Sequence, residues 1–563
     1  MRMCARESLI KGEFPMSNKE YRMSKEGVLS ILSILKKSER SDPTLRHSAV
    51  LVHRSPLLGD SIFCGSLFPV FSFPRWSMRT RQIFFWLSCL SAVILSIILF
   101  GCAPVGPDYV PPTMPSPKAW HTNLKYGLTT NDPAPETLAT WWETLHDPTL
   151  TKLMEQAVTG NLDLKVARSR VRAARARRTI SRSGLFPSVD ASASGTRNRL
   201  SEERYGGDDY DLYAAGFDAT WELDIFGGTR RSVEAADADI QEQEEDLRDV
   251  MVSLLSEVAL NYIDVRTFQA GIVVAWSNLE AQENTFQLTQ SRYEAGLTNE
   301  LAVQQATYNI ENTRSKIPVL RIALEGAMNH IAVLLGQEPG ALHAELKKPR
   351  MIPFTPPIVA VGIPAETLRR RPDLRSAERR LAAQTARVGE ATADLYPRFR
   401  LLGSIGLETL SLGDVFSASG LAYLIGPSIS WPVFNAEAIR SNIEVQSELQ
   451  EQALLEYEAA VLNALKDVEN ALISYAEEQN RRKALSASAE AAERAVELSE
   501  SQYQAGLTDF TGVLDAQRSL LSFQEQLTRS EGAVTSNLVR LYKALGGGWV
   551  PLPRDASQDS AEP

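Results

Sequence analysis

The sequence predicts a mixed, mainly helical fold, in which very long helices adjoin a few membrane-type β-strands and one structural unit occurs twice in tandem. Three observations predict this fold class. The same landmarks recur 210 residues apart, and proline is absent from residues 228–317 and 436–545. Before each of these stretches lie segments of about ten residues that alternate small or apolar residues with polar ones, the pattern of strands in a membrane barrel.

Residues 78–101 have the organisation of a secretory signal peptide. Two arginines precede the apolar segment "IFFWLSCLSAVILSIILF" at 83–100, and the small Gly101 stands before Cys102. The other cysteines are Cys4, Cys64 and Cys89, so cleavage before Cys102 leaves one thiol and excludes a disulfide. The stretch "LFGC" resembles the lipobox of bacterial lipoproteins, which implies a covalent lipid on Cys102. The alternative is a transmembrane anchor, because a segment of 18 apolar residues can just span a bilayer.

Three segments lie outside the repeated units. Residues 1–77 precede the signal peptide and are interpreted as an upstream mis-start or dispensable extension, with a real cytoplasmic extension as the alternative. Residues 102–140 contain eight prolines after the lipid cysteine, which predicts an extended tether rather than a packed element. Residues 549–563 are expected to form a disordered tail.

The mature chain reads as a tandem duplication. The first repeat occupies residues 141–340, a linker follows at 341–364, and the second repeat occupies 365–548. The matching landmarks, each 210 residues apart, are "NLDLKVARSRVRAARA" and "RPDLRSAERRLAAQTA", "LFP" and "LYP", Trp221 and Trp431, "YEAGLT" and "YQAGLT", and "LLG" and "ALG". Five landmarks at one spacing are hard to obtain by chance.

Each repeat has the same internal order. A helix ends at a proline, a hairpin of two strands follows, and long helices complete the unit. The expected ranges are helices at 161–184 and 373–394, hairpins at about 187–225 and 397–434, and long helices at about 228–336 and 436–545. The helix before each Ala-Gly-Leu-Thr motif spans roughly 100 Å at about 1.5 Å per residue.

Two hairpins give four strands, too few to close a membrane barrel of about eight or more strands. Unpaired strand edges cannot face lipid, because each naked N–H or C=O group costs several kcal/mol there. We therefore expect two or three copies to close one barrel. The long helices, which exceed a hydrocarbon core of about 30 Å, are expected to project into an aqueous space as a tube. The alternative is a soluble helical bundle, which would not need the hairpins.

Three stretches carry a family resemblance. "IPAETLRRRPDLRSAERRL", "YQAGLTDFTGVLDAQRSLL" and "GPDYVPP" resemble TolC-type outer-membrane efflux proteins, in particular the NodT/OprM-like lipoprotein subfamily. The resemblance implies a homotrimer in outer-membrane lipid, with a 12-stranded barrel, a helical barrel in the periplasm and a channel gated at its periplasmic tip. It also implies a periplasmic membrane-fusion adaptor and an inner-membrane pump, of the resistance-nodulation-division type, as partners in exporting small molecules. Two alternatives are a protein-secretion conduit of the same family and a lipid-anchored periplasmic coiled-coil scaffold.

The Ala-Gly-Leu-Thr motifs are expected at the turns between long helices. Gly296 and Gly506 would supply the backbone freedom of the turn, and Thr298 and Thr508 would cap the returning helices. One reading is that these residues form helix turns and nothing more. The resemblance implies in addition that the turns dock the adaptor, through Gly296, Leu297, Thr298, Gly506, Leu507 and Thr508.

The resemblance also implies a periplasmic gate. Its candidate residues are Asp515, Tyr503, Asp509 and Glu300. Three copies of Asp515 in a tight ring would raise one another's pKa and could hold a divalent ion, whereas the plain reading is a solvated helix carboxylate. Gln305 stands at the equivalent position of the first repeat, so an asymmetric gate is expected. Both Asp515→Ala and Tyr503→Phe are expected to widen the closed tip.

The candidate gate shows no basic partner in sequence. Gln502 and Gln504 stand where some relatives place a basic residue, which argues against a salt-bridge lock at that spot. Pro318 has no counterpart in the second repeat and is expected to kink its helix.

No pattern of catalytic residues stands out. The six histidines show no metal-binding spacing, and neither a phosphate-binding loop nor a nucleophile elbow occurs. We expect no enzyme, no metal and no cofactor apart from the lipid. The net charge of -10 argues against a nucleic-acid partner.

Overall fold

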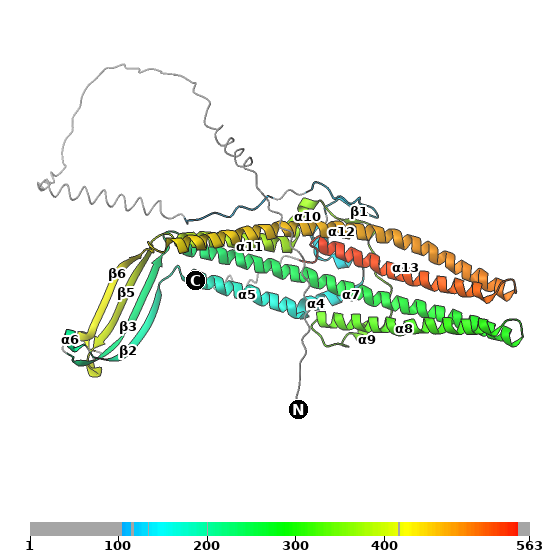
Figure 1. The fold of residues 1–563 in the computed structure, drawn as a ribbon, viewed down its shortest axis with the longest axis horizontal. Coiled ribbons are helices and arrows are strands. Elements are labelled where there is room, and N and C mark those ends of the chain that lie inside the picture. Colours follow the sequence, from blue (N-terminus) through cyan, green and yellow to red (C-terminus); the bar gives the residue numbers. More distant parts are fainter. Residues whose placement is uncertain are drawn as a thin grey trace, which may run out of the picture. The chain divides into compact units, whose positions relative to one another are not determined.

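The computed structural model describes residues 104–113, 117–132, 134–199, 201–205, 207–414 and 417–549 (Figure 1). The segments predicted at 1–77 and 78–101, the lipid cysteine Cys102 and residues 550–563 of the predicted tail lie outside the described residues.

The two repeats fold into the same succession of elements. In the first repeat these are α5 (Leu162–Ser183), β2 (Ser188–Arg199), β3 (Asp209–Leu223), α7 (Gly228–Glu294) and α8 (Glu300–Leu334). In the second they are α11 (Pro372–Ala393), β5 (Arg398–Thr409), β6 (Leu421–Ser430), α12 (Ala436–Gln504) and α13 (Phe510–Ala544). The predicted duplication is therefore confirmed element by element.

The spacing of 210 residues holds at the level of single hydrogen bonds. Trp221 donates its indole N–H to the carbonyl oxygen of Leu185 at 3.0 Å. Trp431 does the same to Leu395 at 3.1 Å. Each bond joins the end of a hairpin to the segment between the preceding helix and the first strand. The two tryptophans therefore have the same structural role in the two repeats.

The four strands form one antiparallel sheet in the order β2-β3-β5-β6 (Figure 1). Strands β3 and β5 join the two hairpins, with Gly216 opposite Gly406. A Cβ added to Gly216 would lie 2.8 Å from the Cα of Gly406, so the close approach of these strands requires glycine. Within the described residues, β2 and β6 each pair on one side only, which confirms four strands with two open edges.

Helices α7 and α12 run without interruption over 67 and 69 residues, as the proline-free stretches predict. Each begins next to the sheet and ends at an Ala-Gly-Leu-Thr turn (Figure 1). Nearer the sheet, α5 and α11 pack on α7, and α11 also packs on α12. Nearer the turns, α8 and α13 pack on α7, and α13 also packs on α12. One chain thus places four helices side by side at each level.

A large apolar core lies midway along the helices. Trp141, fully buried, stacks on Tyr542 of α13 with ring centroids 5.4 Å apart. Helix α4 (Pro148–Gly160) adds Leu150, Leu153 and Met154, all fully buried. This core joins the first and second repeats where α5 and α11 give way to α8 and α13.

Short elements complete the structure around this core. Strand β1 (Leu128–Thr129) pairs in parallel with β4 (Val359–Ala360), which ties the N-terminal segment to the inter-repeat linker. The others are α3 (Pro135–Ala139), η1 (Trp141–Leu145), α6 (Glu202–Tyr205), α9 (His343–Leu346), α10 (Pro364–Arg370), η2 (Leu412–Asp414) and η3 (Ala418–Gly420).

The prediction that residues 102–140 form an unpacked tether is wrong for the described part of that segment. Tyr109 donates its hydroxyl to Glu378 at 3.1 Å, and the backbone N–H of His121 donates to Glu469 at 2.6 Å. Trp120 donates to the carbonyl oxygen of Gly362 at 2.9 Å. Prolines keep this backbone extended, but they do not prevent its aromatic side chains and free N–H groups from binding the helices beneath.

Helix α8 continues through Pro318 to Leu334, so the kink predicted there does not interrupt it. Among the described residues, α8 is the one helix long and apolar enough to cross a membrane by length and composition. A third of its apolar window is buried in the chain.

Candidate gate and docking site at the helical tip

The two Ala-Gly-Leu-Thr motifs form the same turn. Gly296 and Gly506 both have φ of +72°, which places them in the left-handed region that favours glycine. The N–H of Leu297 donates to the carbonyl oxygen of Arg292 at 2.8 Å, and that of Gly296 donates to Tyr293 at 2.9 Å. This pair of bonds is the Schellman motif that ends a helix. Nothing lies within 4 Å of a Cβ on Gly296, so backbone conformation alone demands glycine there.

The predicted capping threonines are wrong by one residue. Asn299 accepts a hydrogen bond from the N–H of Ala302 at 3.2 Å, and Asp509 accepts one from Gly512 at 3.4 Å. These residues, and not Thr298 or Thr508, are the N-caps of α8 and α13. Thr298 and Thr508 still belong to the turn that follows each first helix. The next helix therefore starts one residue later, at the caps Asn299 and Asp509.

Replacing the cap distinguishes the two assignments. Asp509→Ala is expected to destabilise the first turn of α13 by about 1 kcal/mol, a roughly fivefold change in the opening equilibrium. Hydrogen exchange of residues 510–513 measures it. Thr508→Ala is the matched control and should leave exchange there unchanged. Faster exchange in the threonine variant alone would contradict the assignment.

The predicted docking residues are accessible. Leu297 and Leu507 are among the most exposed apolar side chains at this end of the chain, at 68% and 80%. An exposed leucine at each turn, held on a rigid backbone motif, is suited to contact another protein. The adaptor-docking role of both turns stays a prediction.

Tyr503 lies inside the tip and not at its surface. It is 2% exposed and packs edge-on against Phe510, with ring centroids 5.6 Å apart. Within the described residues its hydroxyl has no hydrogen-bond partner. The ring, and not the hydroxyl, therefore makes the contacts of Tyr503, which speaks against the expectation that Tyr503→Phe widens the tip.

Arg292 of α7 joins the two helical hairpins at this point. Its Nη1 donates to the carbonyl oxygens of Tyr503 at 3.0 Å and Gln504 at 3.1 Å. Its guanidinium lies 4.7 Å from the centroid of the Tyr503 ring, a cation–π contact. A cation at the last carbonyl groups of a helix also interacts favourably with the helix dipole. Arg292 thus caps α12 from the neighbouring hairpin.

Arg292 is not among the predicted site residues, because a basic partner is expected only near Asp515, in the second repeat. The signal was present in the repeat itself. Arg292 and Gln502 occupy equivalent positions in "SRYEAGLT" and "SQYQAGLT", so only one of the two turns carries a cation there.

The predicted gate acids do not come together within one chain. Asp515 is exposed on α13, Glu300 is the exposed first residue of α8, and Asp509 serves as an N-cap. No group of three metal-binding side chains occurs among the described residues. A ring of Asp515 would require further copies of the chain and stays a prediction.

The interface between the two hairpins is mixed near the tip. Ala302 and Ala306 of α8 share one buried apolar cluster with Tyr503 and Phe510 of the second hairpin, and hydrogen bonds lie beside it. Gln517 of α13 donates to Thr285 of α7 at 2.8 Å and to Glu500 of α12 at 2.9 Å. Further from the tip, Asn278 donates to Gln524 at 2.6 Å. By contrast, the interface between α7 and α8 is apolar, with Leu279, Ile310 and Ile317 buried together. The two hairpins are therefore held together both by an apolar cluster at the tip and by hydrogen bonds.

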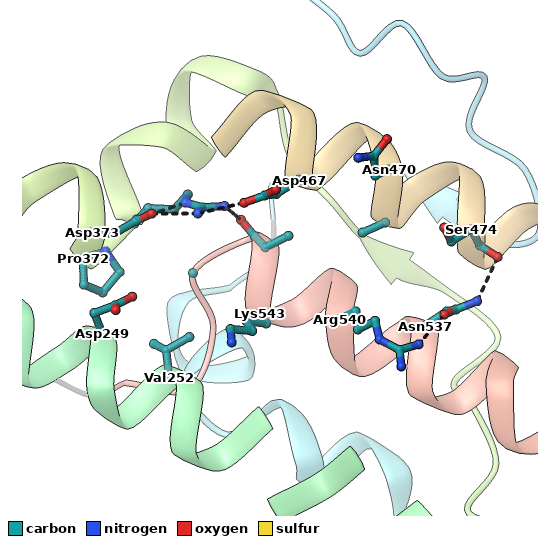
Figure 2. Close-up of a pocket in the computed structure, with 14 residues that line it drawn as sticks. Asp249, Val252, Pro372, Asp373, Asp467, Asn470, Ser474, Asn537, Arg540 and Lys543 are labelled. Carbon is teal, nitrogen blue, oxygen red and sulfur yellow. Dashed lines mark hydrogen bonds and ion pairs between the residues drawn. The ribbon is translucent and has the colours of Figure 1, made fainter. Parts of the chain in front are cut away.

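The Arg-Pro-Asp-Leu stretch lies at the central core and not at the tip. Arg371 donates twice to Asp373, at 3.0 and 2.7 Å, and once to the carbonyl oxygen of Ala544 at 2.9 Å (Figure 2). It also lies 3.6 Å from Asp467 of α12. One guanidinium thus connects the start of α11, the end of α13 and the middle of α12.

A cavity of about 290 Å³ adjoins this arginine (Figure 2). Asp249 of α7 and Lys543 of α13 line it. Burial, reinforced by the negative charge of Asp373, raises the pKa of Asp249. The nearby cations Lys543 and Arg371 oppose that shift. The cavity lies among residues that hold the helices together, so it is part of the structural core.

Comparison with known proteins matches both repeats to one protein family. The family model described as "Outer membrane efflux protein" matches residues 153–337 and 363–547. Nodulation protein T of Rhizobium leguminosarum bv. trifolii is 31% identical over 463 residues, covering 82% of this chain and 97% of that protein. The probable efflux pump outer membrane protein TtgC of Pseudomonas putida is 30% identical over 479 residues, covering 84% and 98%.

Solved structures resemble the fold closely. The outer-membrane channel OprN is 37% identical, with a TM-score of 0.75 and coverage of 79% of this chain and 99% of that one. The open state of the MtrE outer membrane channel of Neisseria gonorrhoeae is 27% identical, with a TM-score of 0.70 and the same coverage. The two matched family segments coincide with the two structural repeats.

Proposed function

The chain belongs to the outer membrane efflux protein family, and from this premise we propose that it forms the outer-membrane channel of a tripartite efflux system. Its family consists of channel proteins and not of enzymes. The observation that carries the proposal is the junction of a four-stranded sheet with open edges to helices far longer than a bilayer is thick. A sheet that spans the membrane and a helical tube beneath it together make a conduit.

We propose that three copies close the channel. Three four-stranded sheets give 3 × 4 = 12 strands, which is within the range of membrane barrels. The same three copies bring 3 × 4 = 12 helices side by side at each level of the tube. The open edges of β2 and β6 are the physical reason for association, because neither can face lipid unpaired.

The proposed cargo is small molecules delivered by a pump. TtgC is a probable efflux pump component and SrpC a solvent efflux pump component by description, and both resemble this chain over most of its length. A periplasmic adaptor, docked at the exposed Leu297 and Leu507, and an inner-membrane pump would supply that cargo. Protein secretion and a coiled-coil scaffold are not favoured by any observation, and a scaffold would leave the membrane sheet without a role.

The proposed gate is the tip, where the α7–α8 and α12–α13 hairpins meet. Separating the hairpins exposes the apolar cluster of Ala302, Ala306 and Tyr503, while the hydrogen bonds between hairpins can be exchanged for water at lower cost. Arg292 is one of the polar connections, and the ion pair of Lys316 and Glu525 at 2.8 Å is another. The proposed motion is a separation of the two hairpins, with Arg292 bound in the closed state.

The N-terminal segment supports the proposed lipid at Cys102. The N–H of Val105 donates to the carbonyl oxygen of Phe226 at 3.0 Å, and the buried Arg231 donates to the carbonyl oxygen of Val105 at 3.1 Å. Phe226 and Arg231 lie at the junction of β3 with α7, where the membrane boundary is expected. The chain is therefore held at the β3–α7 junction three residues after Cys102, which would suit a lipid at the expected membrane boundary.

Removing the cysteine tests the lipid separately from the channel. Cys102→Ala is expected to abolish incorporation of radiolabelled palmitate, while the barrel still inserts because its edges still need to pair. Cys89→Ala, within the signal peptide, is the control and should label normally. Palmitate in the Cys102 variant would overturn the lipid assignment.

Drug sensitivity tests the efflux function. Deleting the gene is expected to sensitise the host to some members of a panel of detergents, dyes and antibiotics, and the intact gene should restore resistance. Accumulation of a fluorescent dye is the direct measurement. Unchanged accumulation and sensitivity across the panel would contradict the proposal.

A further inference from the structure

A stripe of buried polar side chains runs along the side of α7 that faces the second hairpin. It comprises Asn278, Gln282, Thr285 and Thr289, which follow one another at intervals of three or four residues and are at most 8% exposed. Residues at this spacing lie on one face of a helix. Because a buried polar group is costly unless it forms hydrogen bonds, each member of the stripe is expected to have a partner.

Three of the four members have one. Asn278 donates to Gln524 of α13 at 2.6 Å, and Thr285 accepts a hydrogen bond from Gln517 of α13 at 2.8 Å. Thr289 donates to the carbonyl oxygen of Thr285, one turn earlier in its own helix, at 2.9 Å. The stripe is therefore satisfied on both sides of its second member.

That second member, Gln282, is the exception. It is 3% exposed, and among the described residues neither its amide oxygen nor its amide nitrogen has a hydrogen-bond partner. At the level of Gln282, four residues beyond Asn278, the antiparallel α13 presents Leu521, which is also 3% exposed. A leucine side chain offers no hydrogen-bonding group, so the amide of Gln282 is buried without a protein partner.

An amide in this environment favours the open tip. Closing the hairpins removes the amide from water and gives it no protein hydrogen bond in exchange, which is the costly way to bury a polar group. Separating the hairpins returns it to water and recovers that cost. We propose that Gln282 opposes closure and thereby keeps the closed tip poised to open. This inference rests on the proposed gate at the tip and adds the residue that works against its closed state.

The other contacts described at the tip favour the closed state. Tyr503 and Phe510 of the second hairpin pack on α8 in one apolar cluster, and Arg292 binds the end of α12. Among the described residues the Tyr503 hydroxyl also lacks a partner, but its ring joins the hairpins through Arg292. Within the same part of the chain, the amide of Gln282 has no polar contact that would offset its burial.

The duplication shows that the helix itself does not require an amide at this position. The equivalent residue of α12 is Ala492, which is apolar and also buried, at 7% exposed. An apolar side chain is thus compatible with a long helix that ends at the same kind of turn. The needs of the fold therefore do not explain Gln282, whereas a role in opening does.

Replacing Gln282 with methionine tests this role, because methionine fills nearly the same space without a hydrogen-bonding amide. Every chain also carries a reporter thiol, introduced by Ala306→Cys at a position that is 4% exposed between the hairpins. A maleimide reaches this thiol when the hairpins separate. Gln282→Met should slow its labelling in isolated outer membranes about tenfold, which corresponds to about 1.4 kcal/mol in favour of the closed tip. Dye efflux from cells should slow as well.

Gln517→Met is the matched control. Gln517 is also 3% exposed, but it donates to Thr285 and to Glu500. The same substitution there removes two hydrogen bonds between helices, so it should speed labelling and make the closed channel leak. Chains without the Ala306→Cys reporter give the background labelling of the native thiols.

Three results would overturn the role of Gln282. They are labelling as fast as in the parent reporter chain, labelling that becomes faster as in Gln517→Met, and slower labelling with unchanged dye efflux. Each of them leaves the channel intact, provided that the parent chain lowers dye accumulation in a deletion strain. A parent chain that does not lower it would contradict the proposed channel as well.

Discussion

Replacing Arg292 with glutamine is expected to make the closed channel leaky. The substitution removes two charge-assisted hydrogen bonds to the end of α12 and the cation–π contact with Tyr503. Because Arg292 is partly exposed, we expect its contacts with α12 to stabilise the closed state by about 2 kcal/mol. Their loss corresponds to a roughly 30-fold shift of the equilibrium from closed toward open. Single-channel conductance in planar bilayers measures it, and sensitivity to an antibiotic too large for ordinary porins measures it in cells.

The neighbouring residues provide sharp controls. Arg494→Gln removes an exposed ion pair with Glu490 within α12 and should leave conductance unchanged. Tyr503→Phe keeps the ring over which Arg292 lies and should also resemble the wild type, whereas Tyr503→Ala should leak. If the Arg292 variant conducts no more than the Arg494 variant, Arg292 does not hold the tip closed.

Replacing Arg371 with alanine is expected to damage assembly and not gating. Arg371 is nearly buried and connects three helices at the central core. Its loss leaves the carbonyl oxygen of Ala544 and the partly exposed Asp373 without this partner. Because Asp373 is 35% exposed, we expect a cost of about 1–3 kcal/mol, less than for a fully buried ion pair. We expect much less protein in the outer membrane, and a lower temperature at which the remaining oligomer dissociates in detergent.

Arg369→Ala is the matched control, since Arg369 lies two residues away and is exposed. It should assemble normally. Equal amounts and equal heat stability of the Arg369 and Arg371 variants would contradict the structural role given to Arg371. Gly546 shows how closely the site is packed, because a Cβ there would lie 3.2 Å from the Cα of Arg371.

The repeat and the positions of proline were enough to predict the order of helices and strands. The absence of proline from 228–317 and 436–545 predicted α7 and α12, and the repeat of Trp221 at Trp431 predicted two equivalent hairpins. These features are local or periodic, so a single sequence displays them. The docking of Tyr109 and Trp120 was not predictable in this way, because their hydrogen bonds join positions more than 200 residues apart.

The tip was predictable in part. Glycine at positive φ has a local cause, and both turns were located correctly through Gly296 and Gly506. The cap shifted from Thr508 to Asp509 because the geometry of the preceding turn decides where the next helix starts. The repeat shows that Arg292 differs from its counterpart Gln502, but it does not show what Arg292 binds, because that depends on α12 ending beside α7 in the folded chain.

The stoichiometry of the detergent-solubilised protein tests the central claim most directly. Several copies are needed to close one barrel, because one sheet leaves β2 and β6 open. Native mass spectrometry of the complex released from outer membranes should give the mass of three chains. A single chain that stays folded in buffer without detergent would contradict the account.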